Sequence, residues 1–235
     1  YCIEFCQLFG KRWLYFDTEG STTQFEDAHQ YSAKEPWGIF HVHRGSVREV
    51  SKMLAGLVER AETGKFPFDV VVVDGISEYQ TAQGFAIAKE NAAINPKLDA
   101  KKLDKQGWGD ILAELLSNMG DLVYLHSLGL HVLMTAHVRI TKDPIDPLSE
   151  LLRPWVRGQF GDTIEHYFDI VTYCEKRVAR EGGDVRTVRR MFFGQLGDFL
   201  TKNRWEHKGV LPTVIEKPSA KDILTKLGIL KEAVV

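Results

Sequence analysis

Several features that would assign this 235-residue sequence to a familiar class are missing from it. Its three cysteines show no metal-ligand spacing with a second pair, which argues against a disulfide framework and indicates a reducing compartment. No apolar run approaches the roughly 20 residues of a membrane helix, and the first residues do not resemble a signal peptide. We therefore expect a soluble, cytoplasmic protein with no membrane partner.

A large excess of charge of either sign is also missing, since the formal net charge is -2. Bulk charge therefore does not predict a nucleic-acid binder, and any such contact would need a local basic patch. Apolar residues make up 44% of the chain, enough for a sizeable core. Without repeats or a shift in composition, we expect a single domain over residues 1–235.

The apolar pattern predicts strands that alternate with helices. Such alternation with short connections is typical of an α/β fold, with a mostly parallel sheet that helices cover on both faces. The predicted strands are Trp13–Phe16, Ile39–His43, Phe68–Val73 and His131–Ala136. The predicted helices are Tyr1–Phe9, Val47–Glu62 and Asp110–Leu128.

From Phe168 the pattern changes to consecutive strands joined by short turns. A strong turn signal, Glu181-Gly182-Gly183-Asp184, predicts antiparallel pairing there. We expect a C-terminal antiparallel extension of the parallel sheet, followed by a short helix. The strands are Phe168–Glu175, Thr187–Gly194 and Phe199–Arg204, and the helix is Ser219–Leu227.

Polar residues follow three of the predicted strands, where ligands bind in open α/β sheets. They are Asp17-Thr18-Glu19, Asp74 and Thr135-Ala136-His137. Asp74 follows four valines, which is the Walker B arrangement for a carboxylate that supports a nucleotide-bound Mg²⁺ through water. The alternative is an aspartate that caps the next turn.

Glu19 is the candidate for activating water. Hydrolysis of a phosphoanhydride needs a group that orients and deprotonates the attacking water. In one large ATPase class a glutamate directly follows the Walker B aspartate, but here that residue is Gly75. A carboxylate at the neighbouring strand end could serve instead; the alternative is a solvated loop glutamate.

Five segments resemble the phage-type nucleotide-binding AAA family of RecA-like P-loop ATPases. Three of them, Leu14–Gly20, Phe68–Ser77 and His131–His137, resemble the strands that carry the catalytic glutamate, the Walker B aspartate and the sensor of RecA-like recombinases. The segments are Leu14–Gly20, Phe68–Ser77, His131–His137, Gln106–Gly109, and Lys202-Asn203-Arg204 followed by Leu211-Pro212. The resemblance covers nearly the whole chain and implies a RecA-like core that binds and hydrolyses ATP with Mg²⁺.

The resemblance also implies roles for individual residues. Glu19 would activate water, Asp74 would support Mg²⁺, and Thr18 would bind the cofactor with it. His137 would sense the γ-phosphate, although recombinases have an Asn-Gln pair where this chain has Ala136-His137. Lys202 and Arg204, on one face of a predicted strand, would reach the nucleotide of an adjacent subunit in a ring or filament of identical copies. The alternative for this pair is a solvated basic edge strand.

A phosphate-binding loop, Gly-x-x-x-x-Gly-Lys-Ser/Thr, does not occur in the sequence. The only glycine-lysine pairs are Gly10-Lys11 and Gly64-Lys65, and neither fits the motif. Because Tyr1–Phe9 stands where the helix after that loop belongs, we expect that the chain starts just inside this helix. The chain would then be inactive by itself. The alternative is a degenerate pseudo-ATPase.

Two basic segments are candidates for single-stranded DNA binding, because recombinases bind DNA through mobile loops after the Walker B and sensor strands. Cations beside aromatic rings suit such binding, whereas long loops also carry lysine for solubility alone. The segment 78–107 has Lys89, Lys97, Lys101, Lys102 and Lys105. The segment 139–161 has Arg139, Lys142, Arg153, Trp155, Arg157 and Phe160, within a predicted long loop over 143–161.

The sequence thus predicts a DNA-stimulated ATPase of phage-type recombination or replication. The alternative is a nucleotide-controlled interaction module without turnover. A metal pair at His41 and His43 is not predicted, because no third ligand with suitable spacing is visible.

Overall fold

A four-stranded parallel sheet forms the centre of the computed structural model, with strand order β2-β1-β3-β4. The structure describes residues 2–9, 13–24, 39–41, 47–64, 68–142, 146, 148–181, 184–194 and 199–230. The sheet strands are β1 (Trp13–Asp17), β2 (Ile39–His41), β3 (Val70–Asp74) and β4 (His131–Met134). Asp17 is in register with Asp74, so β1 and β3 end side by side. The predicted parallel sheet is therefore confirmed; His43 lies outside the described residues.

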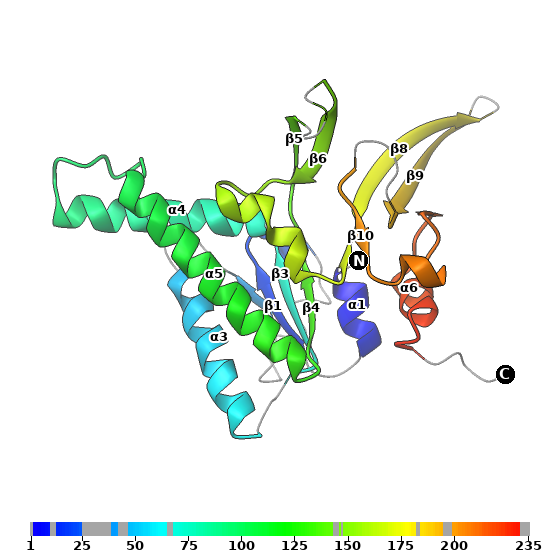
Figure 1. Ribbon diagram of the computed structural model, residues 1–235, viewed down its shortest axis with the longest axis horizontal. Coiled ribbons are helices and arrows are strands. Elements are labelled where there is room, and N and C mark those ends of the chain that lie inside the picture. The colour runs from blue at the N-terminus through cyan, green and yellow to red at the C-terminus, as the bar shows by residue number, and fades with distance from the viewer. Residues whose placement is uncertain are drawn as a thin grey trace.

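Helices cover both faces of this sheet (Figure 1). On one face, α3 (Val47–Glu62), α4 (Ile76–Ile94) and α5 (Lys105–Ser127) pack over the odd-numbered valines of β3. On the other face, α1 (Cys2–Phe9) places the buried Cys6 against Val70 and Val72. The valine run is continuous because successive side chains point to opposite faces, and both faces are buried.

The segment after β3 is mostly helical. The stretch 78–107, for which the sequence left a helix-containing excursion or a mobile loop open, contains most of α4, a connection, and the first turn of α5. The side chain of Asp104 accepts a 2.7 Å hydrogen bond from the backbone of Gly107, which starts α5 five residues earlier than predicted. Of the lysines in this stretch, Lys89 and Lys105 lie on the helices, whereas Lys97, Lys101 and Lys102 lie in the connection between them.

The prediction of one long loop over 143–161 is wrong in part. This segment contains β6 (Glu150–Pro154), which pairs with β5 (Val138–Lys142) as an antiparallel hairpin. The hairpin projects beyond the end of β4 (Figure 1). Two short 3-10 helices follow, η2 (Gln159–Asp162) and η3 (Ile164–Tyr167). Strand pairing therefore places Arg139, Lys142 and Arg153, whereas Arg157 lies after β6.

The C-terminal strands pair antiparallel as predicted, but among the described residues they form sheets of their own and do not extend the parallel sheet. The strands β8 (Tyr173–Glu181), β9 (Asp184–Phe192) and β11 (Val214–Glu216) form one sheet. The predicted strand Phe199–Arg204 shortens to β10 (Lys202–Asn203), which pairs with β7 (Ile170–Val171).

The remaining described elements are short. They are η1 (Ser21–Gln24), η4 (Glu206–Lys208) and α6 (Ala220–Lys226). Helix α6 packs against α1, where the backbone of Ala220 donates to Glu4. Of the helices in the described parts of the chain, none is both long and apolar enough to cross a bilayer.

Candidate active site at the carboxyl edge of the sheet

The ends of β1, β3 and β4 are tied together by backbone hydrogen bonds. Thr18 donates to the carbonyl of Asp74 over 3.1 Å, and Ile76 donates to the carbonyl of Thr135 over 2.9 Å. The strand-end residues predicted to meet therefore do meet. Because these contacts involve the backbone, they fix the site independently of which side chains occupy it.

Three hydroxyl groups surround the carboxylate of Asp74. The Tyr15 hydroxyl donates to Oδ2 over 2.5 Å, and the Ser21 hydroxyl donates to the same oxygen over 2.9 Å. The Thr135 hydroxyl donates to Oδ1 over 2.6 Å. Burial and the bond to Asp74 raise the pKa of Tyr15, which therefore stays a donor.

These hydroxyls fit a carboxylate that acts on Mg²⁺ through water. Oδ2 of Asp74 accepts two hydrogen bonds and Oδ1 accepts one, and this pattern leaves room for a water of a hydrated ion. Mg²⁺ keeps several of its waters and prefers oxygen partners. The donor set is therefore compatible with the predicted role, and Tyr15 and Ser21 join it as residues that the sequence did not indicate.

Asp17 is a structural carboxylate next to this site. Its side chain is 1% exposed and accepts backbone hydrogen bonds from Gly20, Ser21 and Thr22, together with the Thr22 hydroxyl. Burial alone would raise the pKa of Asp17, but these hydrogen bonds hold it below its ordinary value. Asp17 thus shapes the turn that carries Thr18 and Glu19.

Thr18, predicted to bind the cofactor, joins two strand ends. Its hydroxyl lies 2.6 Å from the carbonyl oxygens of both Asp74 and Gly75. A hydroxyl has one hydrogen, so it serves one carbonyl at a time. This position is beside Asp74, while its binding to a cofactor stays a prediction.

Gly75 makes room for Glu19. Its φ of 96° lies in the region that favours glycine, and a Cβ there would lie 2.6 Å from Cγ of Glu19 and from the Thr18 hydroxyl. Real Cβ atoms do not approach other atoms so closely. Because Gly75 has no side chain, the Glu19 carboxylate can lie next to the residue that follows Asp74.

Glu19 lies in a cluster with His137 and Glu78. The sequence indicated the first two residues but not Glu78. Nε2 of His137 is 2.7 Å from Oε1 of Glu78 and 3.6 Å from Oε1 of Glu19. Burial raises the pKa of Glu19 to about 7, the hydrogen bond and charge of Glu78 add to this, and His137 opposes it. Ligand atoms of the three side chains lie within 4.8 Å of one another, a spacing that could hold a metal ion.

His137 also connects this cluster to the hairpin. Its backbone N–H donates to the Ser77 hydroxyl, and that hydroxyl donates to the carbonyl of Trp155 over 2.7 Å. The carbonyl of His137 accepts from the Trp155 backbone over 2.6 Å, and the two rings lie 6.3 Å apart. A change at His137 therefore reaches the base of the β5–β6 hairpin through direct contacts.

Two of the predicted DNA-binding cations are engaged within the protein. Arg139 and Arg153 are cross-strand neighbours, and both lie close to Asp162, at 3.3 and 3.7 Å. Lys142 is exposed at the far end of β5, and Trp155 is 45% exposed. Lys142 and Trp155 are thus more accessible than the two arginines.

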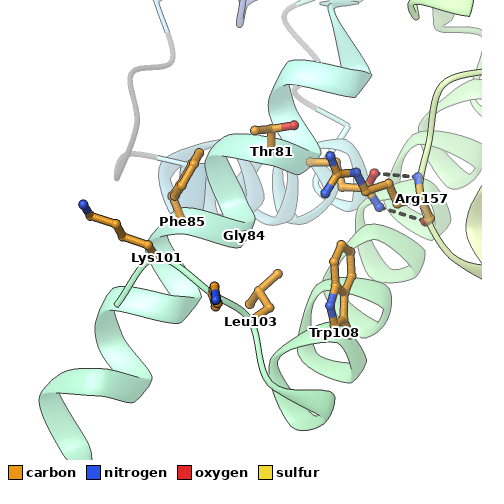
Figure 2. Close-up of a pocket in the computed structure, with 9 residues that line it drawn as sticks. Thr81, Gly84, Phe85, Lys101, Leu103, Trp108 and Arg157 are labelled. Atoms are coloured by element: carbon orange, nitrogen blue, oxygen red, sulfur yellow. Dashed lines mark hydrogen bonds between the residues drawn. The ribbon is translucent and has the colours of Figure 1, made fainter. Parts of the chain in front are cut away.

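Arg157 borders a cavity of about 330 Å³ between α4 and α5. Gln80 holds the Arg157 backbone through two hydrogen bonds, of 2.9 Å from Nε2 and 2.7 Å to Oε1. Figure 2 shows the cavity with Lys101 and Phe85 on one side and Trp108 and Arg157 on the other. Phe85 and Trp108 are each 37% exposed. The remaining residues that line it are Thr81, Gly84, Lys102 and Leu103.

Lys202 and Arg204 contact segments other than the strand-end cluster. The ammonium of Lys202 donates to the carbonyls of Glu165 and His166, and Arg204 pairs with Asp169 over 2.9 Å. The prediction that they share one strand face is wrong, because β10 ends at Asn203. None of the hydrogen bonds or ion pairs of the described residues joins this pair to Asp74 or Glu19.

Comparison with known proteins is consistent with this geometry. A family model described as "AAA domain" matches residues 4–205. The match and the parallel sheet flanked by helices fit a P-loop NTPase fold, and they indicate nucleotide binding and ATPase activity. Use of a nucleotide with Mg²⁺ is what such a family implies. No curated protein matches the sequence significantly.

Proposed function

This chain belongs to the AAA-domain family, and we propose that it is a RecA-like ATPase domain in which Glu19, Asp74 and His137 carry hydrolysis. One observation supports this most directly: the Glu19 carboxylate lies against Gly75, beside the carboxylate-bearing end of β3. A base and a metal-supporting carboxylate thus come from adjacent strands. A bound Mg²⁺–ATP would supply the phosphoanhydride and the cation that neutralises its phosphates.

In this proposal Glu19 accepts a proton from water. A general base works best when its pKa lies near the working pH, and the pKa of Glu19 is raised to about 7 by burial and by Glu78. At neutral pH a substantial fraction of Glu19 is therefore ionised and yet basic enough to take a proton. An exposed glutamate would be a weaker base by more than two pKa units.

His137 would donate a hydrogen bond to an anion at the same edge. Its imidazole is half exposed, and its main chain contacts Ser77 and Trp155. A change of hydrogen-bond partner at the ring can therefore be transmitted to the hairpin. This supports the predicted role of a sensor whose state affects the segment that follows it.

Glu19→Gln tests the enzyme proposal in a protein that carries this domain and binds ATP. We expect ATP hydrolysis to be lost and ATP binding to be retained, because glutamine keeps the shape but cannot accept the proton. Glu59→Gln on the exposed face of α3 is the matched control. Wild-type protein that binds ATP without turnover, with or without single-stranded DNA, would instead support a nucleotide-controlled interaction module.

We propose single-stranded DNA, in phage-type recombination or replication, as the partner. Support comes from cations and exposed rings in one region: Trp155 and Arg157 after β6, Lys142 at the far end of β5, and the cavity lined by Lys101 and Trp108. Arg139 and Arg153, predicted as contacts, would have to exchange Asp162 for phosphate.

The DNA proposal is tested by replacing Arg153, Trp155 and Arg157 together by alanine. We expect affinity for a labelled single strand to fall at least about tenfold, because stacking alone is worth about 1–3 kcal/mol per base. A triple replacement of exposed residues on α3, Lys52, Glu59 and Arg60, is the control. Unchanged affinity would remove the hairpin from the DNA interface.

We also propose a ring or filament of identical copies in which Arg204 faces the nucleotide of the next copy. The side chain of Arg204 is 59% exposed although it pairs with Asp169, whereas Lys202 is held by two carbonyls. Mixing Arg204→Ala with Glu19→Gln protein tests this. Recovery of ATPase activity in the mixture is expected only if active sites form between copies.

A further inference from the structure

We infer that Glu19, Glu78 and His137 form a binding site for a divalent transition-metal ion of the Zn²⁺ type, separate from the Mg²⁺ position at Asp74. The three residues come from different elements: the turn after β1, the first turn of α4 and the segment after β4. Their ligand atoms converge within 4.8 Å. The fold therefore assembles this donor set, because no two of these residues are close in sequence.

The spacing of the donors suits a tetrahedral ion. Zn²⁺ binds nitrogen and oxygen at about 2.0–2.2 Å, which places neighbouring ligand atoms about 3.4 Å apart. His137 Nε2 is 3.6 Å from Glu19 and 2.7 Å from Glu78, so the second distance must open slightly. Three protein ligands leave a fourth position for water or an anion, as in catalytic zinc sites.

Glu78 gives the site a second, independent feature. Its Oε2 atom is inaccessible to solvent and has no hydrogen-bond partner among the described residues, although the side chain as a whole is 32% exposed. A carboxylate oxygen in this position would be stabilised by a cation. In the ion pairs that the structure shows for its described residues, Glu19 and Glu78 pair only with His137. A dication between two carboxylates would supply the partner and offset their repulsion.

The donor types distinguish this ion from Mg²⁺. Imidazole nitrogen suits Zn²⁺ and related ions, whereas Mg²⁺ prefers oxygen in octahedral geometry and keeps its waters. Asp74, with hydroxyl groups on both oxygens, has the environment that suits the hydrated ion. The two carboxylate centres at this edge would thus select different metals.

The metal site also bears on the proposed function, because it includes Glu19. If the proposed function holds, bound Zn²⁺ also occupies the base and inhibits hydrolysis; the metal site itself does not depend on that function.

The experiment is a calorimetric titration of this chain with Zn²⁺, without nucleotide, at pH 7.5. We expect one site that equimolar Mg²⁺ does not displace. Glu19→Gln, Glu78→Gln and His137→Ala should each weaken it at least about tenfold, since even partners of metal ligands are worth 10–100-fold. Circular dichroism checks that each variant is folded, and the near-isosteric Glu78→Gln remains informative if His137→Ala is not.

Matched controls keep the result specific. Glu59→Gln and His166→Ala make the same chemical changes at exposed positions outside the cluster and should leave affinity unchanged. The inference is overturned if the three cluster variants bind Zn²⁺ like wild type, or if Mg²⁺ displaces it. Because no ATP is present, failure of the ATPase proposal would leave this outcome unaffected.

Discussion

Asp74 and Glu19 lie at the same edge of one sheet, yet their surroundings differ. Asp74 is enclosed by hydroxyl groups from Tyr15, Ser21 and Thr135, which donate hydrogen bonds and do not ionise near neutral pH. Glu19 meets another carboxylate and an imidazole. The first environment consists of neutral hydroxyl donors, whereas the second consists of ionisable side chains.

The difference follows from the strand geometry. The side chains of Tyr15 and Asp74 lie on the face of the sheet that α1 covers. The hydroxyl of Tyr15, two positions before the end of β1, therefore reaches the Asp74 carboxylate. Glu19 lies past the strand, where Gly75 lets it cross toward α4 and Glu78. The two carboxylates at this edge therefore have different neighbours, because Gly75 lets Glu19 lie apart from the hydroxyl groups around Asp74.

Gly75→Ala should break this separation and have the largest effect. The added methyl group would collide with Thr18 and Glu19, and alanine is strained at a φ of 96°. We expect the free energy of unfolding in urea to fall by about 3 kcal/mol, since each such backbone strain costs about 1–3 kcal/mol before the collision is added.

Gly64→Ala is the matched control for that change. Gly64 also has positive φ, 71°, but nothing lies within 4 Å of its absent Cβ. It should lose only the backbone part, about 1–2 kcal/mol. Equal losses at both positions would show that Gly75 is not needed to accommodate Glu19.

Tyr15→Phe sharpens the comparison on the side of Asp74. It removes a buried hydroxyl that donates to a carboxylate, and such bonds contribute about 1.5–3 kcal/mol. We expect a loss near the lower end, about 1.5 kcal/mol, because Ser21 still donates to the same oxygen. Tyr124→Phe, at an exposed ring of α5, should be close to neutral. A loss no larger than the control would show that the Tyr15 hydroxyl does not stabilise Asp74.

Glu19→Gln sharpens the other side and has the smallest effect on stability. The pKa of Glu19 is raised in the folded state, from 4.5 to about 7, so the glutamate favours folding below pH 4.5 and this contribution is lost as pH rises toward 7. The variant should therefore be more stable than wild type at pH 8, by about 1 kcal/mol or less because the group is partly solvated. At pH 4 the two should unfold alike, and a difference that is constant across pH would exclude proton-linked stabilisation.

The sequence was sufficient for the sheet and for most of the strand-end cluster. Valine runs buried on both faces leave a continuous apolar signal, and the register of parallel strands then brings Asp17, Asp74 and Thr135 to one edge. Glu19, Asp74 and His137 could be placed together for that reason.

Glu78 was missed because α4 does not show a clean apolar stripe. Ser77, Gln80 and Gln83 are buried polar residues in this helix, and Gln80 finds its partner 77 positions away in the sequence. Such long-range satisfaction of polar groups hides helical periodicity. The β5–β6 hairpin did carry a readable alternation, Val138-Arg139-Ile140-Thr141-Lys142, which the neighbouring prolines obscured.

The paired hydrogen bonds between Gln80 and the Arg157 backbone have a consequence for amide exchange with solvent. The Arg157 amide follows a surface hairpin, yet it donates to the side chain of a buried glutamine. It should exchange slowly, as though it belonged to a strand, until α4 and the hairpin base separate. The exchange rate of the Arg157 amide, measured by NMR, would then change when a ligand enters the neighbouring cavity.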